Sequence, residues 1–198
     1  MSIDDFLLDG WCFRNIAREI LNMTAVRRLV RAGLRTFYRH RTEREKIRRL
    51  GKARWNQRFK FAIVRNPWDK VCSQYFYWIK TNQHEMSSRP IEFSDWVQRA
   101  YVERDLQYHD KHKMFMPQMD WISDRKGSVI VGFVSRFERL YEEFEEACDR
   151  IGIDTALPHV RASKRGSYQD YDGAESKETV RRCFEKDIEY FKYQFQER

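Results

Sequence analysis

Residues 59–80 read FKFAIVRNPWDKVCSQYFYWIK, and this stretch decides the fold that the sequence predicts. Residues 59–64 are a short apolar run bounded by polar residues, which is typical of a buried strand. Asn66 and Pro67 interrupt the run, and residues 68–80 then place apolar side chains at helical spacing, with Pro67 suited to the first turn of a helix. The stretch therefore predicts a strand, a tight turn and a helix.

Further periodic segments lie on both sides of this unit. Apolar residues recur at helical spacing in five other stretches, and a second alternating run predicts another strand. The predicted helices lie within residues 15–33, 42–50, 93–101, 138–151 and 174–193, and the second predicted strand covers residues 128–134. Because strands alternate with helices along the chain, the sequence predicts an α/β domain.

Length and composition bound the organisation of the chain. It has 198 residues, 41% of them hydrophobic, which is enough to bury one sizeable core, so we expect a single domain over residues 1–198. The formal net charge is +8, and much of the positive charge lies in residues 27–60. A basic balance favours anionic partners, such as phosphates, nucleic acid, sulfated or carboxylated sugars, or an acidic membrane surface.

Cysteine spacing and hydropathy exclude several protein classes. Neither a zinc site nor a disulfide scaffold is indicated by the spacing of the four cysteines, Cys12, Cys72, Cys148 and Cys183. No apolar run approaches the roughly 20 residues that span a bilayer, and the start MSIDDFLLDG carries acids where a secretory signal has a basic region. These features predict a soluble, cytoplasmic protein without a transmembrane segment.

The candidate chemistry lies at the end of the first predicted strand. Arg65 leaves the carboxyl end of that strand, where open α/β sheets bind ligands, and Ser73 lies on the following helix. A guanidinium is a two-pronged, permanently charged donor and a hydroxyl adds a further hydrogen bond, so the two side chains suit phosphate oxygens. In the alternative interpretation, Arg65 forms an ion pair with Asp69, and Ser73 is a small residue packed near the sheet.

The segment RNPWDKVCSQY (65–75) resembles the 3′-phosphate motif of the sulfotransferase superfamily, in particular its carbohydrate-type members, those similar to sulfotransferase family 2. In that motif an arginine ends a strand and a serine follows eight residues later. Three later segments resemble the strand and Arg-Phe-Glu turn, the late basic loop and the C-terminal end of the family: VGFVSRFERLYEEFEEACDRIGI (131–153), LPHVRASKRGSYQDYD (157–172) and YFKYQF (190–195). The likeness covers residues 40–198 and leaves residues 1–39 as a divergent helical part.

This resemblance implies a parallel β-sheet core flanked by helices, in a P-loop-kinase-like sulfotransferase fold. It also implies transfer of a sulfuryl group from PAPS (3′-phosphoadenosine 5′-phosphosulfate) to a hydroxyl of a carbohydrate or similar acceptor, without a metal. Arg65 and Ser73 are then expected to hold the 3′-phosphate. The late loop is expected to close over the 3′-phosphate or the adenine with Lys164, Arg165, Ser167 and Tyr168. Without the resemblance, this loop would be interpreted as a mobile basic surface loop.

A catalytic base is also implied by the resemblance. The segment HRTEREKIRRLGKARWNQRFKF (40–61) is similar to a family pattern of the form His-x-Thr-x-x-Glu followed by Gly, Trp and Phe. It makes His40 the expected base, since a neutral imidazole accepts a proton near ambient pH, and Glu45 is the fallback. Without the resemblance, His40 would be a solvated histidine. No carboxylate or cysteine cluster joins His109 and His112 to form a metal site, so we expect them in an acceptor-side loop.

One part of the family pattern is missing from the sequence. The family normally begins with a strand and a loop of the type Pro-Lys-x-Gly-x-Thr-Ser, which holds the 5′-phosphosulfate, and the sequence contains no such loop. Its lysine and hydroxyls offset charge on the transferred group, so their loss is expected to slow catalysis by orders of magnitude. Three explanations stay open: Arg14 substitutes for the lysine, the start is truncated, or the protein binds without reacting.

Three functional hypotheses follow. The leading one is a PAPS-dependent sulfotransferase, and the second is an inactive relative that binds the nucleotide or an anionic glycan. The third is a nucleic-acid or membrane-surface binder that uses the basic helices of residues 25–58. Nucleic acid is not expected as a partner, because no nucleic-acid motif is present. No pattern specifies the acceptor or an oligomeric state, and the acceptor pocket is expected from the variable segment 81–125.

Overall fold

The computed structural model describes residues 41–82, 91–109, 111–152, 154, 166–171 and 173–196. These residues divide into two compact units, of which the first holds residues 41–64, 119–152 and 154 and the second holds the rest. The elements, in chain order, are α3 (Glu43–Leu50), α4 (Lys52–Asn56), β1 (Phe61–Val64), α5 (Pro67–Thr81), α6 (Phe93–Val97), the π-helix η3 (Gln98–Glu103), the 3₁₀ helix η4 (His112–Phe115), α7 (Gln118–Ile122), β2 (Phe133–Arg136), the 3₁₀ helix η5 (Phe137–Arg139), α8 (Leu140–Ile151), the 3₁₀ helix η6 (Tyr168–Asp170), α9 (Ala174–Cys183) and α10 (Glu185–Phe191). The one or two helices predicted within residues 15–33 lie outside the described residues.

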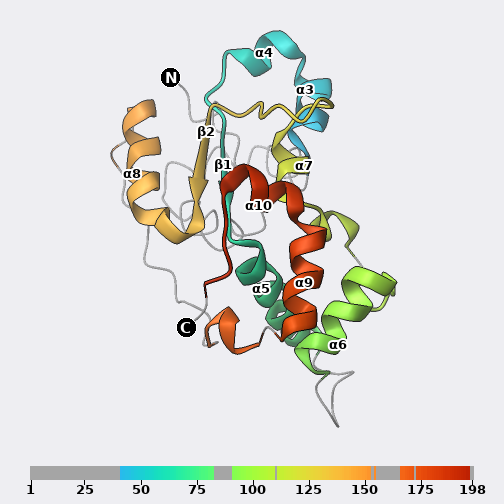
Figure 1. The fold of residues 1–198 in the computed structure, drawn as a ribbon. Coiled ribbons are helices and arrows are strands. Elements are labelled where there is room, and N and C mark those ends of the chain that lie inside the picture. Colours follow the sequence, from blue (N-terminus) through green and yellow to red (C-terminus); the bar gives the residue numbers. More distant parts are fainter. Residues whose placement is uncertain are drawn as a thin grey trace. The chain divides into compact units, whose positions relative to one another are not determined.

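The first unit contains a two-stranded parallel sheet. β1 pairs with β2 in a register that runs from Phe61 opposite Phe133 to Val64 opposite Arg136. All four residues of β1 are buried, as expected for a strand of a parallel sheet. Helix α8 packs against β2 (Figure 1). The described residues therefore confirm the predicted mixed α/β class, with a small parallel sheet.

The second predicted strand was placed too early. Residues 128–134 were expected to form it, but β2 begins at Phe133 and ends at Arg136. The preceding residues fold back instead, because Val129 forms an isolated antiparallel bridge with Ser123. The parallel pairing follows the point where the backbone N–H groups of Gly132 and Phe133 both donate to the Lys60 carbonyl, at 3.0 and 3.1 Å. The alternating pattern of VIVGFV fits both arrangements, so it could not locate the start of the strand.

Helix α3 follows the sequence prediction closely. Its first turn is closed by a capping box, in which the Glu45 N–H donates to the Thr42 hydroxyl at 3.3 Å and the Thr42 N–H donates to the Glu45 carboxylate at 2.7 Å. Gly51, with φ of 81°, ends the helix. The buried face carries an ion pair, because Lys46 Nζ lies 2.6 Å from Glu43 Oε1 and both side chains are almost fully buried.

The second unit is built on helix α5. Asn66 caps this helix by accepting a hydrogen bond from the Trp68 N–H at 3.1 Å, and Pro67 is its first residue, as predicted. Helices α9 and α6 pack against α5 (Figure 1). Together they bury the apolar and aromatic side chains Trp68, Val71, Cys72, Tyr75, Trp78, Phe93, Trp96, Val97, Val180 and Phe184.

Two helices of the second unit differ from the prediction. The segment predicted as one helix over residues 93–101 forms α6 and then continues as the π-helix η3 to Glu103. The segment predicted as one helix over residues 174–193 divides at Phe184, which leaves helical geometry with φ of −118° and ψ of 24°. The Phe184 side chain is fully buried and its ring contacts that of Tyr101. Packing of this ring in the core accompanies the break between α9 and α10.

Candidate anion-binding site at the start of helix α5

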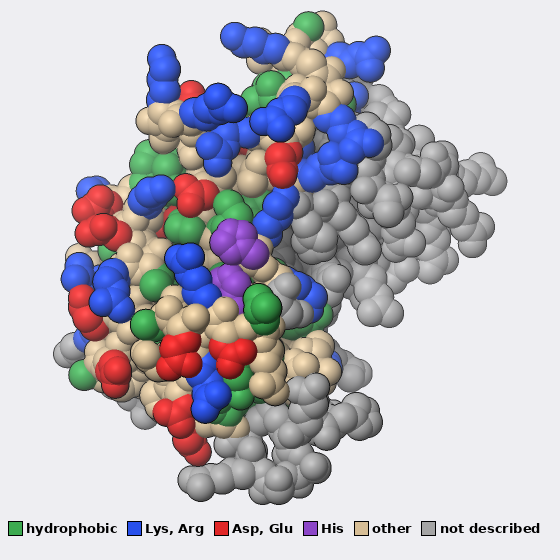
Figure 2. All heavy atoms as spheres, turned by 90° about the vertical axis from the view of Figure 1, so that its right-hand side faces the viewer, with side chains coloured by type: hydrophobic (Ala, Val, Ile, Leu, Met, Phe, Trp, Pro, Cys, Tyr) green, Lys and Arg blue, Asp and Glu red, His purple; other side chains and the backbone are tan. Residues whose placement is uncertain are grey.

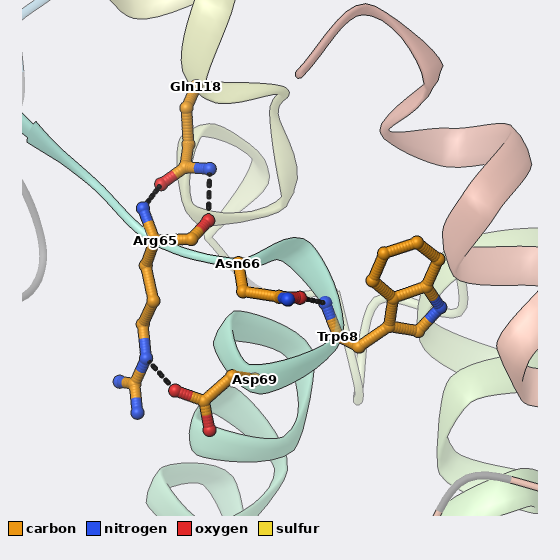
Figure 3. A network of polar contacts seen from close by, with 5 residues as sticks. All are labelled: Arg65, Asn66, Trp68, Asp69 and Gln118. Atoms are coloured by element: carbon orange, nitrogen blue, oxygen red, sulfur yellow. Dashed lines mark hydrogen bonds and ion pairs between the residues drawn. The ribbon is translucent and has the colours of Figure 1, made fainter. Parts of the chain in front are cut away.

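Arg65 directly follows β1 and precedes the cap of α5. It is 8% exposed, and its Nε donates to Asp69 Oδ2 in an ion pair between residues four positions apart (Figure 3). The sequence had offered this pair as the alternative to phosphate binding, and the structure contains it. A guanidinium carries five N–H donors, so an ion pair through Nε is compatible with a further anion.

The main chain of Arg65 is held by the side-chain amide of Gln118. The Arg65 N–H donates to Gln118 Oε1 at 2.8 Å, and Gln118 Nε2 donates to the Arg65 carbonyl at 2.8 Å (Figure 3). The amide thus satisfies both backbone groups of the residue that leaves the strand. Gln118 is held in turn by Asp187, whose Oδ2 accepts from the Gln118 backbone N–H at 2.7 Å and from Nε2 at 3.2 Å.

One face of α5 anchors the segment that carries Gln118. Lys70 Nζ donates to the Met116 carbonyl at 3.1 Å, and Gln74 Nε2 donates to the Met114 carbonyl. One turn further on, Trp78 Nε1 donates to the Gln107 carbonyl at 3.2 Å. Residues 70, 74 and 78 are four apart and therefore share a helix face, so three side chains of α5 hold the carbonyls of Gln107, Met114 and Met116.

Ser73 lies on α5, four residues after Asp69, and is half-buried. Residues four apart lie on the same face of a helix, so Asp69 and Ser73 line one face and are separated by about 6 Å along the axis. The Arg65 side chain reaches the first of these two positions. The partner of the guanidinium therefore lies one helical turn before Ser73.

The end of the late basic loop lies in the same unit. The Ser167 hydroxyl donates to Gln169 Oε1 at 2.6 Å. The ring of Tyr168 meets that of Phe195 edge-on with centroids 5.4 Å apart, and Phe195 meets Trp68 edge-on at 5.5 Å. Phe195 thus connects Tyr168 to the RNPW turn. Lys164, Arg165 and the expected base His40 lie outside the described residues.

The fallback base and the histidine pair both have local structural partners. The Glu45 carboxylate closes the capping box of α3. His109 is buried, with Nδ1 2.7 Å from the Ala100 carbonyl and Nε2 3.1 Å from Nδ1 of His112. Within the described ranges no group of three or more His, Cys, Asp or Glu side chains is arranged to hold a metal ion.

Two residues of the site were missed by the sequence analysis. Nothing in the motif MFMPQMD marks Gln118, because its partner Arg65 is 53 residues away. Asp187 did carry a signal, since it lies three residues after Phe184 and four before Phe191 on the apolar face of the last helix. A carboxylate at such a position indicates a buried polar partner.

The surface of α3 and α4 is basic. Figure 2 shows Lys and Arg side chains gathered over the end of the molecule that carries these helices, and the exposed ones are Arg48, Arg49, Lys52 and Arg54. Among the helices of the described residues, none combines the length and the hydropathy that a bilayer crossing requires.

The fold and the site define an α/β protein in which a buried parallel strand ends in an arginine at the start of a helix. A sequence profile described as the sulfotransferase family matches residues 22–194, so the chain belongs to the sulfotransferase family. It is also 28% identical over 110 residues to an uncharacterized protein of Archaeoglobus fulgidus, over 55% of this chain and 80% of that protein. No solved structure matches the chain.

Proposed function

We propose that the chain is a PAPS-dependent sulfotransferase that moves a sulfuryl group to a hydroxyl of a carbohydrate or similar acceptor. The observation that carries this proposal is the placement of Arg65, whose guanidinium pairs with Asp69, the residue one helical turn before Ser73 on the same face of α5. Membership of the sulfotransferase family supports the same assignment.

In this proposal the donor binds through its 3′-phosphate. Arg65 supplies charged hydrogen-bond donors and Ser73 a neutral one, while the late loop covers the nucleotide with Lys164, Arg165, Ser167 and Tyr168. His40 accepts the proton of the acceptor hydroxyl as the S–O bond to that oxygen forms. The S–O bond to the donor phosphate breaks, and adenosine 3′,5′-bisphosphate leaves. This arrangement belongs to the P-loop-kinase-like sulfotransferase fold, and no metal takes part.

The test is donor turnover by the full chain. The protein is incubated with PAPS and a panel of glycans with free hydroxyls, and release of adenosine 3′,5′-bisphosphate is followed by chromatography. We expect release that increases with one class of glycan, and slower release in His40→Ala with unchanged nucleotide affinity. A wild-type protein that neither binds nor releases the bisphosphate would contradict the proposal.

A second function is favoured by the sequence, which lacks a Pro-Lys-x-Gly-x-Thr-Ser loop. An inactive relative would bind adenosine 3′,5′-bisphosphate, or an anionic glycan, without releasing sulfate from PAPS. The turnover assay separates the two functions, because binding without turnover supports the inactive relative and turnover excludes it.

A further inference from the structure

Gln118 acts on Arg65 as a neighbouring strand would. Strand β1 ends at Val64, so the backbone N–H and carbonyl of Arg65 lie beyond the sheet ladder. The Gln118 amide accepts from that N–H and donates to that carbonyl, each at 2.8 Å. Two hydrogen bonds to the same residue fix the orientation of the peptide groups on either side of Arg65. They therefore fix the direction in which its side chain leaves the backbone.

Asp187 decides which way the Gln118 amide faces. Its Oδ2 lies 3.2 Å from Gln118 Nε2 and also accepts the Gln118 backbone N–H, and the Asp187 side chain is fully buried. An amide nitrogen donates to a carboxylate, whereas an amide oxygen would be repelled by it. Nε2 must therefore face Asp187, which leaves Oε1 to accept from the Arg65 N–H.

The far end of the Arg65 side chain is held separately. Nε donates to Asp69, so the side chain is fixed at its backbone by Gln118 and at its guanidinium by Asp69. A planar guanidinium binds phosphate with geometric specificity only when it is presented at a fixed angle. Ordering it before the ligand arrives removes part of the entropic cost of binding.

We propose that Gln118, held by Asp187, is a positioning residue that orders Arg65 for the 3′-phosphate of the nucleotide. The proposal rests on the function proposed above. It predicts that Gln118 influences only the part of nucleotide affinity that comes from the 3′-phosphate. General damage to the fold would instead weaken the binding of nucleotides with and without that phosphate to the same extent.

The experiment compares two nucleotides that differ only in the 3′-phosphate. Calorimetric titrations of adenosine 3′,5′-bisphosphate and of AMP into the full chain give the ratio of the two dissociation constants. In Gln118→Met, which keeps the size but not the hydrogen bonds, we expect the ratio of the dissociation constant for AMP to that for the bisphosphate to fall by about tenfold. This change corresponds to about 1.4 kcal/mol of hydrogen bonding to the 3′-phosphate. The affinity for AMP should stay unchanged.

Three further variants keep the test decisive. Gln118→Glu keeps the acceptor for the Arg65 N–H but loses the donor, so it should lower the ratio even if Gln118→Met does not fold. Asp187→Asn keeps an oxygen for the Gln118 N–H and should preserve most of the ratio. Tyr75→Phe removes a different hydrogen bond of α5, from the Tyr75 hydroxyl to the Ile91 carbonyl at 2.7 Å, and should leave the ratio as in the wild type.

The outcomes separate the two proposals. If the wild type prefers the bisphosphate and the Gln118 variants keep that preference, the positioning role is wrong and the proposed function stands. If the wild type shows no preference for the bisphosphate, the proposed function fails and the positioning role fails with it. A loss of affinity for both nucleotides in equal measure would show a structural role and would also overturn the proposal.

Discussion

Arg65→Ala is expected to weaken binding of adenosine 3′,5′-bisphosphate by about 10²- to 10⁴-fold. A hydrogen bond to a charged group contributes about 1.5–3 kcal/mol, so losing two of them removes about 3–6 kcal/mol. Each 1.4 kcal/mol corresponds to about a tenfold change in the dissociation constant. Titration calorimetry measures the affinity, and the rate of PAPS turnover at low donor concentration should fall by a similar factor.

Two variants control for charge and for fold. Arg65→Lys keeps the positive charge but loses the two-pronged donor, so it should bind with an affinity between those of the wild type and Arg65→Ala. Arg139→Ala also removes an arginine that forms ion pairs with residues three and four positions later, Glu142 and Glu143. This variant should bind the bisphosphate with the affinity of the wild type. Equal affinities in Arg65→Ala and the wild type would show that Arg65 serves only its ion pair with Asp69.

Lys46→Met is expected to lower the free energy of unfolding by about 3–5 kcal/mol, which is the range for removing one partner of a buried ion pair. Lys46 and Glu43 are almost fully buried on α3, and their side chains meet at 2.6 Å. The variant would leave the Glu43 carboxylate buried without its cation, while Oε2 of Glu43 already has no hydrogen-bond partner in the described part of the chain. Urea denaturation followed by circular dichroism gives the free energy of unfolding.

The matched control replaces both partners. In Glu43→Leu/Lys46→Met no charge is left in the buried site, so the double variant should be clearly more stable than Lys46→Met. A double variant no more stable than the single one would show that the loss comes from packing.

The same pair predicts a pH dependence. Burial raises the pKa of Glu43 above its ordinary value of 4.5, and Lys46 opposes the shift. The native state therefore holds this proton at pH values where the unfolded chain has lost it, so the Glu43 contribution to stability falls as pH rises from about 4.5 through the raised pKa. The wild type should lose stability relative to the double variant across that range. A stability difference that does not change with pH would contradict this prediction.

The elements that the sequence predicted well are those with local stop and start signals. Thr42 and Gly51 bound α3, and Pro67 marks the start of α5, so these helices lie where their patterns place them. The elements predicted less well depend on contacts with distant residues. β2 starts where its backbone meets Lys60, and the last helix breaks where Phe184 enters the core. Periodicity within a segment carries no information about either contact.

In the candidate site, too, the features within one short motif were predicted and the contacts between distant residues were not. The order of strand, Arg65 and helix could be predicted from the sequence, because it lies within one short motif. The structure confirms this order. The ion pair with Asp69 was foreseen only as an alternative to phosphate binding. Gln118 pairs with Arg65, 53 positions away, and with Asp187, 69 positions away, so no local pattern could have shown these pairings. The carboxylate of Asp187 on an apolar helix face indicated only that a buried polar partner exists. The phosphate-binding roles of Arg65 and Ser73 stay predictions.

The most direct test of the proposed 3′-phosphate site is a crystal structure of the chain with adenosine 3′,5′-bisphosphate. We predict that oxygens of the 3′-phosphate lie within about 3 Å of the Arg65 guanidinium and of the Ser73 hydroxyl, which is hydrogen-bonding distance. Gln118 should still hold the main chain of Arg65. A nucleotide bound with its 3′-phosphate away from both Arg65 and Ser73 would contradict the assignment of this site.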